Sequence, residues 1–225
     1  MPIVGGRASG CSVQILAARL CEGLGGRSAA RDEVRTAIHE VGHAIVAHRL
    51  GVWVRWVAVG REALELELEP DAARGMLGCC SHGNHVERHE ARDRQCTAHE
   101  RATIGAGGLA AEALASGKHP RRSWAARNGH YYKAWRAWKE RNDLSDAIHD
   151  LDPEGRAPWN AHLAYSRAAH IALEILADDH AQEGFERLVP LLLERRHLIG
   201  CDVQDALGPH WLGCEARYAP SPASL

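Results

Sequence analysis

The chain has 225 residues, with 27 lysines and arginines against 29 aspartates and glutamates. This near-neutral balance gives no electrostatic reason to expect nucleic-acid binding. No run of about 18 apolar residues indicates a transmembrane helix. The seven cysteines include no C-x-x-C pair. An odd number of cysteines favours free thiols in a reducing compartment, so we expect a cytoplasmic protein with no membrane anchor.

Residues 1–30 are rich in glycine, alanine and serine and form the first expected segment. A short helical pattern covers Val13–Cys21, interrupted by the polar side chains of Gln14 and Arg19. We expect a mobile lead or a loosely docked helix here, and not a signal peptide.

A helix is predicted over Asp32–Arg49, because apolar residues recur there at helical spacing. The stripe consists of Val34, Ile38, Val41 and Ile45. Gly51 follows directly, and glycine commonly terminates a helix.

This helix carries an H-E-x-x-H motif made of His39, Glu40 and His43. Side chains four residues apart share one helix face, so both imidazoles can bind one zinc ion at roughly 2.0–2.1 Å. Glu40 lies beside the pair, where a carboxylate can take a proton from an attacking water. The alternative is a histidine pair that is hydrogen-bonded or solvated on a helix surface.

Three strands are expected after this helix. Val52–Val59 is β-branched and aromatic, and Ala63–Glu69 alternates apolar and acidic residues although each residue alone prefers a helix. Met76–Ser81 is a third candidate. The pattern predicts a small sheet beside the H-E-x-x-H helix.

Residues 79–99 are rich in cysteine and histidine, which raises the possibility of a second metal site. Their spacing matches no zinc ribbon or finger. We therefore expect a polar surface loop leading into a helix, and one zinc ion for each chain. The residues concerned are Cys79, Cys80, His82, His85, His89, Cys96 and His99.

The rest of the chain is predicted to be mainly helical, up to a disordered tail at residues 213–225. Gly105, Gly107 and Gly108 fall inside the first of these helices and suggest that another helix packs very close. The expected helices are Asp93–Ser116, Tyr131–Asp150, Ala161–Asp178, Glu183–Arg195 and Asp202–Leu207.

Several blocks of sequence, in this order, resemble the peptidase domain of the FtsH-type zinc proteases. The first, TAIHEVGHAIVAHRLG at residues 36–51, is specific; the shorter ones gain weight from their order. The likeness extends over roughly residues 31–208. The shorter blocks are GGLAAE at residues 107–112, Asn142-Asp143-Leu144, and the stretch from Phe185 to Val203.

The resemblance implies a mainly α (α+β), zincin-like metalloprotease domain over residues 31–212. In it, His39 and His43 would bind Zn²⁺ and Glu40 would be the general base. The family's third ligand, an aspartate in an Asn-Asp pair, corresponds to Asp143. Asp146 and Asp150 are the fallback ligands, and the alternative role of Asp143 is a helix cap.

Glu112 corresponds to a family glutamate that follows the glycine pair. Two roles are open for it. It either supports a zinc-binding histidine through a hydrogen bond or forms a salt bridge between packed helices.

The chain departs from the family in three ways. It contains no G-x-x-x-x-G-K-[ST] phosphate loop, no transmembrane anchor is expected, and residues 118–141 form a basic, tryptophan-rich insertion. The resulting expectation is a zinc metalloendopeptidase that acts on polypeptides, with a separately encoded ATPase as a candidate partner. The alternatives are a different small H-E-x-x-H protease of the repressor-cleaving type, and an inactive helical binding or scaffold domain.

Overall fold

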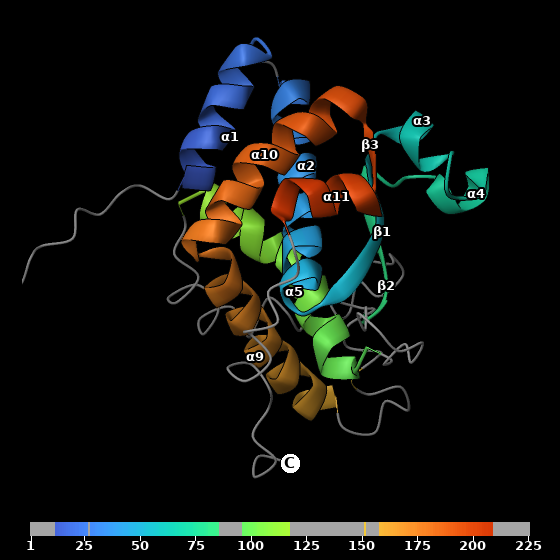
Figure 1. Ribbon diagram of the computed structural model, residues 1–225, viewed down its shortest axis with the longest axis vertical. Helices are drawn as coiled ribbons and strands as arrows, with labels where there is room; N and C mark the ends of the chain where they lie inside the picture. Colours follow the sequence, from blue (N-terminus) through green and yellow to red (C-terminus); the bar gives the residue numbers. More distant parts are fainter. Residues whose placement is uncertain (1–11, 27, 86–95, 118–150, 152–157, 209–225) are drawn as a thin grey trace, which may run out of the picture.

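The long helix α2, Ser28–Arg49, forms the centre of the molecule (Figure 1). The computed structural model describes residues 12–26, 28–85, 96–117, 151 and 158–208. Along its second half, from Val41 to Arg49, every α2 residue is buried, including polar ones. Such all-round burial means that α2 is packed on every side and is not a surface helix.

The helices and strands follow one another in mainly α order with one small sheet (Figure 1). Apart from α2 they are α1 Ser12–Gly23, β1 Val52–Val59, α3 Arg61–Leu64, α4 Pro70–Ala73, β2 Gly78–His85, α5 Ala98–Ala115, α9 Pro158–Leu176, α10 Asp179–Arg195, β3 His197–Ile199 and α11 Gly200–Leu207.

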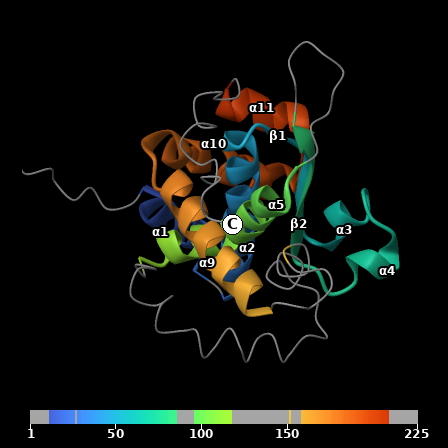
Figure 2. The same ribbon diagram turned by 90° about the horizontal axis from the view of Figure 1, so that it is seen from below.

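The sheet is antiparallel with the order β2-β1-β3, so β1 is its central strand. One face packs on α2, and its other face carries a small second core with α3 and α4 (Figure 2). Cys80 belongs to the main core and Cys79 to the second one. Neighbouring residues of β2 therefore point to opposite faces, as the period of a strand requires.

Glycines allow α2 and α5 to pack with almost no space between their backbones. A Cβ atom at Gly42 would lie 2.6 Å from the carbonyl oxygen of Gly107 and 2.6 Å from the Cβ of Ala111. A Cβ at Gly107 would lie 2.8 Å from the carbonyl oxygen of Gly42. Helix axes this close need residues without side chains at the crossing point, as the glycines of the sequence suggested.

The prediction of a strand at Ala63–Glu69 is wrong. Residues 63–69 form the end of α3 and a following helical turn, in which the amide of Leu68 donates to the carbonyl of Leu64 at 2.9 Å. Leu64 is fully buried and Leu68 packs on the second core, whereas Leu66 is 72 % exposed. Burial thus follows the helical spacing of four, and the helix preference of the individual residues prevails over the alternating pattern.

The other elements within the described residues agree with the expectation of a mainly helical chain with a small sheet. Strand β1 has the predicted limits, β2 starts two residues later than expected, and β3 was not anticipated. Of the two expectations for the N-terminal segment, the structure has the docked helix, in which Val13 and Leu16 of α1 are buried. The segments expected at residues 131–150 and 213–225 lie outside the described residues.

None of the described helices has the length and apolar content to cross a membrane.

The close contact between α2 and α5 predicts a stability effect. Gly107→Ala should lower the free energy of unfolding by about 1–3 kcal/mol, because the added methyl meets the backbone of α2. Urea unfolding followed by circular dichroism measures this change. In the control Gly23→Ala, the methyl meets nothing within 4 Å, and the change should stay below about 1 kcal/mol. Equal stability of the two variants would contradict the packing argument.

Candidate metal centre

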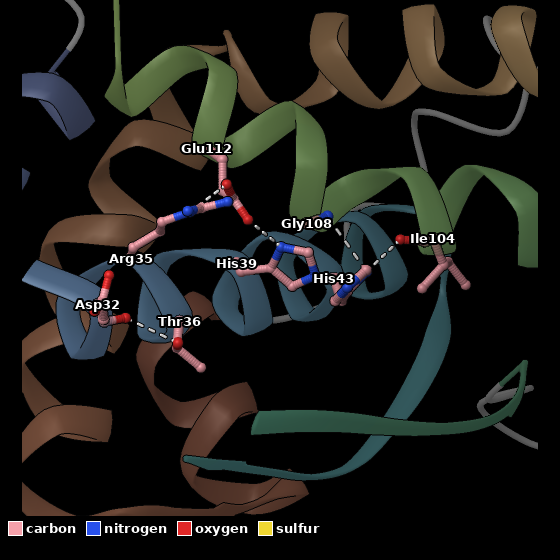
Figure 3. A network of polar contacts seen from close by, with 8 residues as sticks. All are labelled: Asp32, Arg35, Thr36, His39, His43, Ile104, Gly108 and Glu112. Carbon is pink, nitrogen blue, oxygen red and sulfur yellow. Dashed lines mark hydrogen bonds and ion pairs between the residues drawn. The ribbon is translucent and has the colours of Figure 1, made fainter. Parts of the chain in front are cut away.

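His39 and His43 lie one helical turn apart on α2, on the side that faces α5 (Figure 3). Their ring centroids are 4.8 Å apart, and the rings meet edge to face at 76°. His43 is buried, with 6 % of its surface exposed, while the side chain of His39 keeps 18 %. The helix therefore places the two imidazoles together in a protected position, as the motif predicted.

His39 is held by Glu112 of α5, which is in turn held by Arg35 (Figure 3). His39 Nδ1 lies 2.8 Å from Glu112 Oε1, and Arg35 Nε donates to Glu112 Oε2 at 2.6 Å. Burial alone would raise the pKa of Glu112, but the hydrogen bonds from His39 and Arg35 lower it below its ordinary value. The carboxylate is therefore ionised at neutral pH and accepts a hydrogen bond from the protonated Nδ1 of His39.

His43 is held by the backbone of α5. Its Nδ1 lies 2.7 Å from the carbonyl oxygen of Ile104 and 3.3 Å from the amide nitrogen of Gly108. A single Nδ1 cannot donate to the first and accept from the second at once. The shorter contact decides, so Nδ1 of His43 carries the proton and donates it to Ile104.

Gly108 gives His39 its room. A Cβ atom at this position would lie 2.4 Å from Nε2 and 2.5 Å from Cδ2 of the imidazole. The ring of His39 thus lies directly over the α5 backbone. Of the two adjacent glycines in α5, Gly107 accommodates the α2 backbone and Gly108 accommodates the His39 ring.

Glu40 lies on the side of α2 that faces β2 and is buried, with 7 % of its surface exposed. Its nearest neighbour on the strand is Gly78, where a Cβ atom would lie 2.7 Å from Glu40 Cγ and 2.8 Å from Glu40 Oε1. The H-E-x-x-H helix is therefore enclosed by two elements. Helix α5 holds the histidines and strand β2 covers the glutamate.

His82 is a residue of this region to which the sequence assigned no specific role. It shares a face of β2 with Gly78 and Cys80. Burial lowers the pKa of His82, and the nearby His43, Arg101 and Arg55 lower it further. A hydrogen bond with the backbone of Gly83 acts in the opposite direction, but the pKa remains below its ordinary value. Its Nδ1 is buried and has no hydrogen-bond partner among the described residues. The alternation of β2 was the signal that could have placed His82 near the motif.

The expected third ligand, Asp143, and its fallbacks, Asp146 and Asp150, lie outside the described residues. Within the described part of the chain, no group of three or more His, Cys, Asp or Glu side chains is arranged to hold a metal ion. The adjacent thiols of Cys79 and Cys80, considered for a second metal, pack into different cores on opposite faces of β2.

The chemistry of the two histidines fits a zinc ion. Since Nδ1 carries the proton in both rings, Nε2 carries the lone pair that a metal takes. A histidine whose other nitrogen donates to a carboxylate or a backbone carbonyl is the usual arrangement of a zinc ligand. The site thus offers two oriented imidazole nitrogens, one carboxylate beside them, and a carboxylate that holds one of the imidazoles.

Neither a scan against models of protein families nor a search of curated proteins finds a match to this chain.

The contact between Glu112 and His39 predicts an effect on metal binding. Glu112→Ala should weaken zinc affinity by about 10–100-fold, because His39 loses the acceptor that fixes its orientation. Competition with a chromophoric chelator measures the affinity. Arg35→Ala is the matched control: it removes the more exposed partner and keeps the bond to His39, so its effect should be smaller. An unchanged zinc affinity in Glu112→Ala would mean that the role of Glu112 is the salt bridge between packed helices and not the support of His39.

Proposed function

We propose that the chain is a zinc-dependent metalloendopeptidase whose His39 and His43 bind the metal and whose Glu40 is the general base. The observation that carries this proposal is the pair of adjacent, edge-to-face imidazoles with both Nδ1 atoms anchored to α5. Two histidines held in this way have their Nε2 atoms oriented toward a common metal position, which supports the assignment. The resemblance of residues 36–51 to the FtsH-type zinc proteases supports the same assignment.

Glu40 would move the proton in this reaction. Bound zinc supplies Lewis acidity, which polarises the scissile carbonyl and lowers the pKa of a water molecule to about 7. The carboxylate of Glu40 then accepts the proton of the attacking water and gives it to the amine that leaves. Its position on α2, one residue after His39 and buried beneath β2, keeps the carboxylate close to the ligands without making it one.

Strand β2 supports a polypeptide as the substrate. Among the described strands, in the order β2-β1-β3, it is an end strand, and it runs past Glu40 at Gly78. An extended peptide can add to the edge of a sheet through main-chain hydrogen bonds, which depend little on sequence. A peptide bound along β2 would pass the general base with its backbone accessible. We therefore propose extended or unfolded chains as the substrate class.

The proposal extends to the cellular setting. An ATPase would be the natural partner for folded substrates, since unfolding a domain requires about 5–15 kcal/mol. Within the described residues, Cys21 and Cys201 are free thiols, which supports a reducing, cytoplasmic location.

The role of Glu40 is tested by Glu40→Gln. This variant should bind zinc like the wild type but lose peptide hydrolysis by at least about 10²-fold, because an amide cannot accept the proton. A quenched, disordered peptide reports hydrolysis, and atomic absorption reports zinc content. Glu62→Gln makes the same chemical change on the exposed surface of α3 and should leave both unchanged.

Two outcomes would count against the proposal. Hydrolysis at the wild-type rate in Glu40→Gln would remove Glu40 as the base. A wild-type protein that binds zinc and cleaves no peptide would instead favour the inactive scaffold.

The third ligand is tested separately. Asp143→Ala should lower the zinc content of the purified protein, because a catalytic zinc normally has three protein ligands. Asp146→Ala and Asp150→Ala should keep the wild-type content. If one of these two controls loses the metal and Asp143→Ala keeps it, the ligand lies further along the chain than the family motif implies.

A further inference from the structure

Gly78 is the point at which the sheet touches the carboxylate of the H-E-x-x-H motif. A Cβ atom here would lie 2.7 Å from Glu40 Cγ, 2.8 Å from Glu40 Oε1 and 2.8 Å from Thr36 Cγ2. Real Cβ atoms do not approach other heavy atoms so closely, so any side chain would force a movement. The backbone conformation of Gly78 is not left-handed, so the reason for a glycine here is space.

The movement would fall on Glu40, because two of the three nearest atoms belong to its side chain, and the strand backbone and Thr36 are both held by hydrogen bonds. Gly78 pairs with Val59 of β1, and the residue before it is held by a hydrogen bond from the amide of Gly60 to the carbonyl of Leu77 at 2.9 Å. Thr36 is held by a 2.9 Å hydrogen bond from Oγ1 to the carbonyl of Asp32. The side chain of Glu40 has three rotatable bonds, so its carboxylate can turn aside.

We propose that Gly78 is a positioning residue for Glu40: the bare strand backbone and Thr36 form the two walls that hold the carboxylate beside the histidines. This inference rests on the proposed function of Glu40 as the base. The wall comes from β2, while the metal ligands are held by α5 (Figure 3). A defect at Gly78 therefore affects the base and leaves the metal in place.

The test is Gly78→Ala in the full chain. Zinc content and affinity should match the wild type, because the atoms nearest to the added methyl belong to Glu40 and Thr36 and not to a histidine. The kcat for a disordered peptide should fall between about tenfold and about a hundredfold, since a displacement of about 1 Å in a reacting group has effects of this size. KM should change by less than about threefold, because the substrate-binding edge of β2 is kept.

A second variant separates positioning from general damage to the fold. Thr36→Ser removes the Cγ2 atom and keeps the hydroxyl that bonds to Asp32. In the double variant with Gly78→Ala, the new methyl has space on the Thr36 side, so Glu40 can return and kcat should recover by several-fold. A merely destabilised protein would not be rescued by the loss of another methyl. Gly23→Ala, which meets no neighbour, is the control for a glycine change elsewhere.

The results also separate this inference from the proposed function. If the wild type hydrolyses peptides and Glu40→Gln does not, the function stands; wild-type kcat in Gly78→Ala, or no rescue by Thr36→Ser, would then overturn the positioning role alone. Loss of zinc from Gly78→Ala would overturn it as well, because the wall would then support the ligands. A wild type without hydrolysis would remove the function and, with it, the inference.

Discussion

The contact between α2 and α5 through Gly42 and Gly107 is the constraint on which the rest of the structure depends. Only backbones that touch can bring the carbonyl of Ile104 to 2.7 Å from His43 and the carboxylate of Glu112 to 2.8 Å from His39. A side chain at the crossing would separate the helices and lengthen both bonds together. The glycine of the H-E-x-x-H motif therefore serves the histidines on either side of it, although it carries no functional group.

The histidines and the glutamate of one motif are supported by different parts of the fold. Helix α5 holds both imidazoles, whereas Glu40 is covered by β2, a strand in a separate layer (Figures 1 and 3). A helix alone fixes the Cα and Cβ positions of these residues, but not the positions of their polar atoms. Their final positions come from two neighbours that reach α2 from different directions.

The sequence predicted those parts of the structure that depend on local pattern. The motif helix, strand β1, and helices α5, α9 and α10 follow from apolar spacing, and the sharing of a face by His39 and His43 follows from helix geometry. The prediction of a strand at residues 63–69 failed because the same alternation also fits a helix, in which leucines four residues apart share a face. Burial of that face decided between strand and helix.

Features that depend on distant contacts were harder to predict. Glu112 was singled out, yet its choice between a histidine and a salt bridge needed the distance across two helices; in the structure it has both partners. The closeness of Gly78 to Glu40 and of His82 to His43 depends on how β2 lies across α2. The alternation along β2 puts Gly78 and His82 on one face of the strand, but it does not say where that face meets α2.

The central place of β1 has a consequence for the order in which the chain folds as it leaves the ribosome. Its partner β2 is made soon after it, but β3 on its other edge comes from the far end of the sequence. Until β3 is synthesised, one edge of β1 lacks the strand that covers it, and such an edge invites pairing with other chains. The nascent protein therefore passes through a stage in which one edge of its central strand is uncovered, and β3, the last of the described strands to be made, covers it.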